Sequence, residues 1–224
     1  MKQADDGDRS SVDRVYEALR EKILSGVYAP GSRLILSRLA NEHEMSFIPV
    51  REALQRLEGE RMVRSERNRG ATVTELSIDD MRDIYETRLI LEDAAIRAAT
   101  AAIDERQLER AERALEGMRV NFLDGHDRQA YAWHQEFHFA LYEPAGSAWT
   151  LHLIRLLWSS AERYMRLAAS VRPEAEQFVA EHAQILRAVQ AGDADEAAER
   201  LADNLRTTAR LLGDTYEAKA APGG

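Results

Sequence analysis

Two histidines four residues apart are the first side chains in this sequence whose type and spacing suggest chemistry. His134 and His138, within WHQEFH, share one face of a helix, and this spacing lets both imidazoles reach one metal ion. The pair is not the H-E-x-x-H motif of zinc proteases, because Glu136 follows His134 by two positions and points about 200° away around the helix. A metalloprotease base is therefore missing from this motif. Taken alone, such a pair is more often solvated or packed than a metal site.

A second group of polar side chains lies near the N-terminus. Ser46 can cap the first turn of a helix, and Pro49 stands where no helical N–H is needed. Arg51 and Gln55 lie one turn apart on the outward face of that helix. A shorter helix, predicted over residues 36–43, precedes it after a tight turn. This pattern is typical of a helix-turn-helix, whose second helix enters the major groove of DNA.

A basic segment follows this helix pair. The β-like runs MVRSE and ATVTEL are joined by RNRG, which predicts a hairpin wing with Gly70 at the turn. Arg67 and Arg69 can neutralise phosphates or reach a minor groove, and Asn68 lies between them. We therefore assign Arg67, Asn68, Arg69 and Gly70 to the DNA-binding set. A helix pair beside a hairpin is also an ordinary dimerisation or regulatory module, so the pattern alone leaves both interpretations open.

The periodicity of apolar residues places these groups on elements. Apolar side chains recur at three- and four-residue steps from Ser11, which predicts a first helix ending near Gly26. Beyond Ser77 the pattern becomes long and helical, with helices expected near 78–102, 104–123, 127–143, 147–170, 174–191 and 193–212. Six helices of this length need mutual packing, which predicts an all-α bundle.

The change of pattern predicts two domains. We expect a flexible tail over residues 1–10, a winged helix-turn-helix domain over 11–74 and a linker over 75–79. An all-helical ligand-binding and dimerisation domain should follow over 80–215, and a second flexible tail over 216–224.

Composition narrows the function classes. The 224-residue chain contains no cysteine, which excludes disulfide frameworks, thiolate zinc fingers and cysteine nucleophiles. No apolar run approaches the roughly 18 residues of a membrane span, and no signal peptide is evident, so we expect a cytoplasmic protein without a membrane partner. The net charge of −9 is uneven: residues 1–74 hold 13 basic and 12 acidic residues, and the remainder holds 17 and 27. A local basic patch on an acidic protein suits a segment that meets phosphates.

The chain resembles a known family in three consecutive strings. These are VYEALREKILSGVYAPGSRL, LANEHEMSFIPVREALQRLEGERMV and RNRGATVTELS. Taken in order, they are similar to the winged helix-turn-helix of the GntR family of bacterial transcription regulators, and the helical remainder resembles the FCD domain of its FadR subfamily. The resemblance implies a mainly α fold, with an N-terminal winged helix-turn-helix, a small β-hairpin wing and a C-terminal all-α six-helix bundle.

The resemblance also implies operator contacts from Ser46, Arg51 and the wing tip. Phe47 departs from the family, because an arginine is common at this position, and it cannot make the bidentate guanine contact open to arginine. It either contacts a thymine methyl group or belongs to the core. For Arg51 the alternative is a salt bridge with Glu52 or Glu58.

A second departure lies before the wing. The usual Gly-Leu pair of the family is Arg61-Met62 here, so the local backbone conformation is in question.

For the helical domain, the resemblance implies a divalent metal. The four family ligand positions hold His134, His138, His182 and Asn204, of which two match the family in type. Three imidazoles with an amide or water suit Zn²⁺ or Ni²⁺ better than Ca²⁺ or Mg²⁺. A metal-free polar pocket is the alternative.

The resemblance further implies a small carboxylate effector. Arg88 can supply an anion contact, with an i, i+4 ion pair to Glu92 as the alternative. Arg163 and Tyr164 are weaker candidates, and Trp133 is a candidate wall of the pocket.

These observations together predict a homodimeric, ligand-responsive transcription regulator that binds double-stranded operator DNA and is not an enzyme. The rival from another class is a helical metalloenzyme that uses the His cluster, although no general base or nucleophile motif accompanies it. A structural helical dimer is the third interpretation.

Overall fold

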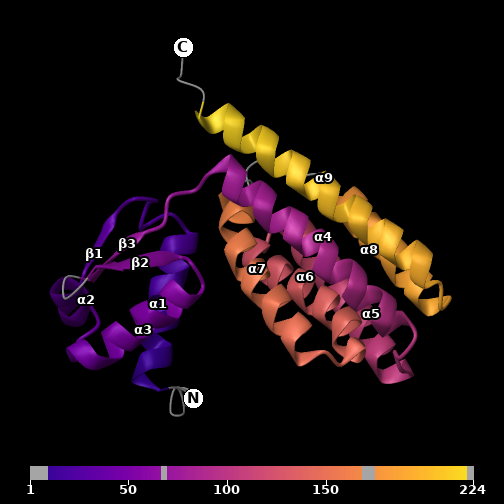
Figure 1. The fold of residues 1–224 in the computed structure, drawn as a ribbon, viewed down its shortest axis with the longest axis horizontal. Coiled ribbons are helices and arrows are strands. Elements are labelled where there is room, and N and C mark those ends of the chain that lie inside the picture. Colours follow the sequence, from indigo (N-terminus) through magenta and orange to yellow (C-terminus); the bar gives the residue numbers. More distant parts are fainter. Residues whose placement is uncertain (1–9, 67–69, 168–174, 221–224) are drawn as a thin grey trace. The chain divides into compact units, whose positions relative to one another are not determined.

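The computed structural model describes residues 10–66, 70–167 and 175–220, and it divides into two compact units (Figure 1). We call Met1–Ser77 unit 1 and Ile78–Gly224 unit 2.

Unit 1 combines a helical layer with a small antiparallel sheet. Its helices are α1 (Ser11–Leu24), α2 (Leu36–Glu42) and α3 (Phe47–Gly59), and its strands are β1 (Arg33–Ile35), β2 (Val63–Glu66) and β3 (Gly70–Val73). The strand order is β1-β3-β2, so the predicted hairpin is present and gains a third strand. Strand β1 was not predicted from the sequence, because three residues are too short to show a period-two pattern.

The core of unit 1 lies between α1 and α3. Val15 and Leu19 from α1 meet Val50 and Leu57 from α3, and each of the four is at most 1% exposed. Burying side chains of this size contributes about 1.5–3 kcal/mol each. Ser10 is the N-cap residue of α1, and its hydroxyl accepts a hydrogen bond from the Asp13 amide at 3.1 Å.

The connection between α2 and α3 is a tight turn. Glu44 adopts a positive φ of 52°, a left-handed conformation that non-glycine residues seldom take. Ser46 is the N-cap residue of α3, as predicted, but its hydroxyl makes no capping hydrogen bond. Pro49 occupies the first turn, where its missing N–H costs nothing. The turn therefore presents the start of α3 with the Ser46 hydroxyl uncommitted to the helix.

Unit 2 is all-helical over the residues that the structure describes. Its α-helices are α4 (Ile78–Thr100), α5 (Glu105–Leu123), α6 (Asp127–Tyr142), α7 (Ala148–Leu167), α8 (Ala175–Gln190) and α9 (Ala194–Ala220), with a 3-10 turn, η1 (Glu143–Ala145), between α6 and α7. Helix α4 packs against α6, α7 and α9, and α5 packs against both α6 and α8 (Figure 1). The mainly α fold predicted from the sequence is confirmed.

Local signals in the sequence fix most helix ends in unit 2. Asp104 and Gln107 form a reciprocal capping box at the start of α5. Gly146 and Gly192 take left-handed conformations in the turns just before α7 and α9. The prediction for α9 was wrong at its C-terminus, because the helix runs to Ala220 instead of ending at 212. Gly213 does not end it, because the helix continues to pack along α4, and Leu212 and Thr215 on either side of this glycine are buried.

None of the helices in the described residues is long and apolar enough to cross a membrane.

Candidate metal centre and nucleic-acid interface

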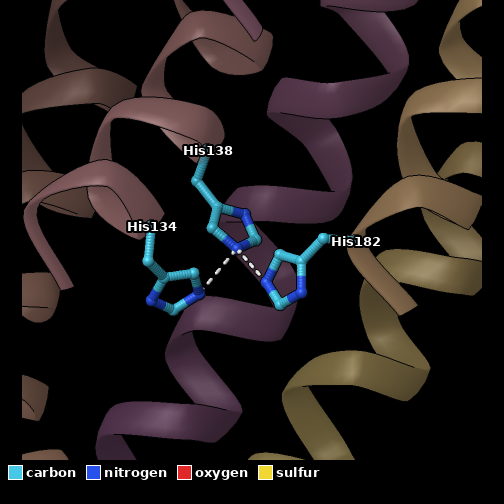
Figure 2. Close-up of side chains that lie close together, drawn as sticks. All are labelled: His134, His138 and His182. Carbon is cyan, nitrogen blue, oxygen red and sulfur yellow. Dashed lines mark hydrogen bonds between the residues drawn. The ribbon is translucent and has the colours of Figure 1, made fainter. Parts of the chain in front are cut away.

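Three imidazoles from two helices converge in the interior of unit 2 (Figure 2). His134 and His138 lie one turn apart on α6, and His182 faces them from α8. The Nε2 atom of His138 lies 3.1 Å from Nε2 of His134 and 3.2 Å from Nε2 of His182. All three side chains are buried. The cluster forms because the two histidines on α6 are spaced one turn apart and because the fold brings α8 alongside α6.

An apolar cluster holds α6 and α8 together through α5. The ring of Phe122 on α5 meets Tyr131 on α6 at 5.8 Å and Phe178 on α8 at 5.2 Å, both edge to face. Phe178 lies one turn before His182 and also packs on the His134 ring. The histidines are thus positioned by aromatic packing that precedes them by about one helical turn on each helix.

Burial keeps these imidazoles neutral. It lowers the pKa of His182 to about 4, and it lowers the pKa of His134 and His138 well below the usual range, with the neighbouring histidines and Arg88 adding to the effect. His182 donates its Nδ1–H to the carbonyl oxygen of Phe178 at 2.7 Å, so its Nε2 carries a lone pair. Neutral imidazoles with free lone pairs are the form that binds metals.

The donor set fits a divalent metal. Nitrogen ligands held about 2.0–2.1 Å from a tetrahedral ion stand about 3.3–3.4 Å apart, slightly more than the 3.1 and 3.2 Å separations around His138. Three neutral nitrogens and no carboxylate within the cluster suit Zn²⁺ or Ni²⁺. Glu136 is not available as a base, because it pairs with Arg110 of α5.

A buried carboxylate lies behind the histidines. Glu92 of α4 accepts hydrogen bonds from Arg88 at 2.7 Å, from the indole of Trp158 at 3.1 Å and from the hydroxyl of Tyr142 at 2.6 Å. Tyr142 in turn lies 3.0 Å from Nδ1 of His138. Arg88 therefore forms the ion pair that was the alternative to an anion contact, and its side chain is 2% exposed. Its guanidinium also stacks over the rings of Trp158 and Tyr85.

The other candidates of unit 2 lie in different surroundings. Asn204 is buried and donates its amide N–H to Glu181 at 3.3 Å, which leaves its amide oxygen as the ligand atom. Tyr164 donates its hydroxyl to Asp80 of α4 at 2.9 Å, and Arg163 is also buried. Trp133, the candidate wall of the pocket, has its ring against Gly117 of α5, at a place where an added Cβ would clash, and is 39% exposed.

Sequence reasoning missed Glu92 as a centre of contacts and missed Tyr142 and Trp158 as its partners. One signal was present: Tyr142 follows His138 by four residues, as His138 follows His134, so all three share one face of α6. Glu92 and Trp158 come from other helices, and no spacing in the sequence indicates that they meet.

The candidate DNA-reading face of α3 is exposed. Arg51 and Gln55 point to solvent, and within the described part of the chain Arg51 has no ion pair. Glu58, one of its expected partners, instead accepts hydrogen bonds from Ser65. Phe47 is 50% exposed and so is not a core residue, which favours the interpretation that it is available to a thymine methyl group.

The wing falls partly outside the described residues. Arg67, Asn68 and Arg69 lie there, so their placement is not described. Gly70 begins β3 with a φ of 111°, and an added Cβ would lie 1.9 Å from the Leu34 carbonyl oxygen. Arg61 adopts a positive φ of 58°, so the position that is commonly glycine keeps the glycine conformation with an arginine. Met62 after it is fully buried.

Comparison with known proteins identifies both units. The family model described as bacterial regulatory proteins, gntR family, matches residues 11–73, and the FCD domain model matches residues 83–207. A transcriptional regulator named BphR from Paraburkholderia xenovorans is 32% identical over 212 residues, covering 91% of this chain and 86% of the relative. The transcriptional repressor GlaR of Escherichia coli is 27% identical, covering 88% and 93%.

Solved structures agree with the fold. The Escherichia coli protein McbR/YncC superposes with a TM-score of 0.80 at 24% identity and covers 93% of this chain and 99% of its own. A GntR-type regulator from Rhodococcus gives a TM-score of 0.75 at 25% identity, covering 91% and 98%. The FCD domain is consistent with the FadR subfamily. The chain belongs to the GntR family of bacterial transcription regulators, with an N-terminal helix-turn-helix domain followed by an FCD domain.

Proposed function

We propose that this regulator senses a small organic acid through a divalent metal, Zn²⁺ or Ni²⁺, held by His134, His138 and His182. The observation that carries the proposal is the meeting of three buried, neutral imidazoles at their Nε2 atoms. Such a metal supplies an electrophilic position for a carboxylate. Asn204 is the proposed fourth ligand, through its amide oxygen.

Two further atoms support a ligand in this region. Among the described residues, Nδ1 of His134 is buried without a hydrogen-bond partner, and the buried Tyr85 hydroxyl has only a weak interaction with the neighbouring Arg88 guanidinium. An unpaired buried polar atom costs about 1–3 kcal/mol, and a bound ligand is one way to satisfy it. Arg88 stacks on the Tyr85 ring with 4.9 Å between the guanidinium and the ring centre. We therefore place the polar end of the effector near Tyr85 and Arg88, while Arg163 and Tyr164 are the weaker candidates.

The winged unit binds operator DNA in this proposal. Ser46, Phe47, Arg51 and Gln55 face the major groove, and the wing residues Arg67, Asn68, Arg69 and Gly70 meet phosphates or a minor groove. Binding occurs as a homodimer on a pseudopalindromic site, and the effector acts by changing the DNA affinity of the dimer. The proposed boundaries are residues 11–74 for the DNA-binding domain, 75–79 for the linker and 80–215 for the sensor. The protein acts in the cytoplasm and has no catalytic role.

The test uses operator fragments selected from a random DNA pool by the purified full chain. We expect the logarithm of the affinity to fall with the logarithm of salt concentration, with a slope of about −0.9 per neutralised phosphate. A panel of small carboxylates should change this affinity in the presence of zinc or nickel, and should have no effect on the His182→Ala variant. A flat salt dependence would contradict the DNA proposal, and turnover of an acid from the panel would favour the metalloenzyme.

A further inference from the structure

The three imidazoles of the cluster differ in what supports their second nitrogen. His182 donates Nδ1–H to a backbone carbonyl, and His138 has the Tyr142 hydroxyl 3.0 Å from its Nδ1. Nδ1 of His134 has no hydrogen-bond partner among the described residues. Partners of this kind fix the tautomer and the orientation of a metal ligand. The difference therefore bears on how well each histidine is prepared for a metal.

The hydroxyl of Tyr142 can donate only one hydrogen bond. Glu92 forms a buried ion pair with Arg88, and an ionised carboxylate can only accept, so the Tyr142 proton must go to Glu92 at 2.6 Å. The oxygen of Tyr142 is left with lone pairs toward His138. Nδ1 of His138 must then be the donor, which leaves a lone pair on its Nε2, the atom that faces both other histidines.

The direction of each hydrogen bond in the series from Glu92 through Tyr142 to His138 is therefore set by the ion pair of Glu92 with Arg88. Arg88 and the indole of Trp158 occupy Oε1 of Glu92, so Oε2 is directed to Tyr142. Glu92 is fully buried, and Tyr142 is 0% exposed, so water does not compete for these contacts.

We propose that Tyr142 and Glu92 are positioning residues that hold His138 as the Nδ1–H tautomer with its Nε2 lone pair ready for the metal, whereas His134 lacks such a partner and is the weakest of the three ligands. The inference about the metal rests on the proposed function. The inference about the tautomer concerns the metal-free protein and stands by itself.

The first test changes one atom. Tyr142→Phe removes the hydroxyl and keeps the ring, and titration with Zn²⁺, Ni²⁺ or Co²⁺ should show an affinity about 10- to 100-fold lower than that of the wild type. The visible spectrum of bound Co²⁺ should change as well, because the orientation of one ligand changes. The matched control is Tyr16→Phe, which removes a tyrosine hydroxyl bonded to a carboxylate, Glu60, in unit 1. That control should bind metal like the wild type.

The second test measures the tautomer without metal. Long-range ¹H–¹⁵N correlation spectra of the chelator-treated full chain distinguish protonation at Nδ1 from protonation at Nε2. We expect His138 to be protonated at Nδ1 in the wild type and in Tyr16→Phe, and to lose this preference in Tyr142→Phe. An unchanged tautomer in Tyr142→Phe, or an unchanged metal affinity, overturns the proposal.

The ligand ranking has its own readout. His134→Ala should weaken metal binding less than His138→Ala and His182→Ala do, and an equal or larger loss would overturn the ranking. If the wild type binds no metal but His138 shows the Tyr142-dependent tautomer, the positioning role stands and the proposed metal function fails. The two failures are therefore distinguishable.

Discussion

The two units place their functional side chains in opposite environments. In unit 1, Arg51 and Gln55 are exposed, and in the described part of the chain Arg51 has no ion pair. In unit 2, the polar groups around Glu92 and His138 are buried and bonded to one another. The side chains of a DNA-binding surface are exposed to solvent until they contact phosphates and bases, whereas the side chains of a small-ligand site are held in place before the ligand binds. Substitutions of these functional side chains should therefore alter binding alone in unit 1 and alter stability together with binding in unit 2.

The largest effect is expected for Arg88→Ala. This change leaves the fully buried Glu92 without its cation, and breaking a buried ion pair from one side costs about 3–5 kcal/mol. Urea unfolding should show this loss in unit 2. The matched control on the same helix is Arg82→Ala, whose pair with Asp79 is exposed and is worth at most about 1 kcal/mol. Equal losses for both variants would contradict the claim that burial makes the Arg88–Glu92 pair costly to break.

The next effect is a loss of unit 2 stability in mild acid. The pKa of His182 is lowered by burial to about 4, from 6.5 in the unfolded chain, and those of His134 and His138 are also lowered. The unfolded state therefore binds more protons as pH falls below 6.5, so stability is complete above that pH and is lost progressively toward pH 4. His182 alone contributes up to about 3 kcal/mol of this loss.

Chelator-treated protein examined by thermal unfolding from pH 7.5 to 4.5 checks this expectation. The stability of unit 1 should depend less on pH over residues 10–66, because His43 is only partly buried and burial lowers its pKa to a lesser extent. Unit 2 should lose stability first. A melting temperature that is constant over this range would contradict the neutral, buried assignment of the cluster.

In unit 1 the sharpest expected effect is on DNA. Arg51→Ala should lower operator affinity by about 1–3 kcal/mol if Arg51 reads a base, and should change the free energy of unfolding by less than about 0.5 kcal/mol. Fluorescence anisotropy and urea unfolding of the same preparation measure both quantities. A stability loss comparable to the binding loss would mean that Arg51 is structural, like the polar residues of unit 2.

The smallest effect compares two helix caps. Ser10 accepts a hydrogen bond from the Asp13 amide, so Ser10→Ala should cost about 1 kcal/mol of stability. Ser46 makes no capping bond, so Ser46→Ala should cost less than about 0.5 kcal/mol while weakening DNA binding. Thermal unfolding of the two variants side by side measures this difference, and a full capping cost at Ser46 would contradict its assignment to DNA.

The same contrast between exposed local elements and buried tertiary contacts explains which functional residues could be predicted from the sequence. The turn and helix that carry Ser46 and Arg51 are contiguous, so local periodicity and capping residues were sufficient to find them. The His134–His138 pair was also visible as a helical spacing, but His182 entered only through family resemblance, because tertiary packing through α5 brings α8 to α6. Glu92 was considered only as a partner of Arg88. Its bonds to Tyr142 and Trp158 join three helices, and no sequence spacing reports such a meeting.

The two errors of prediction, the missed strand β1 and the misplaced end of α9, have the same origin. Strand β1 is stabilised by its pairing with β3 and has almost no local pattern of its own. Helix α9 continues past Gly213, despite the low helix propensity of glycine, because the helix packs along α4 and buries Leu212 and Thr215 on either side of this residue. Tertiary contacts determine both segments, and local sequence signals do not report such contacts.

The most direct test of the central claim is elemental analysis of the purified, tag-free protein beside the His138→Ala variant. We expect about one zinc or nickel ion per wild-type chain and none in the variant, with both proteins folded by circular dichroism. No metal in the wild type after reconstitution, or equal metal in both, would contradict the claim that these three imidazoles form the sensing centre.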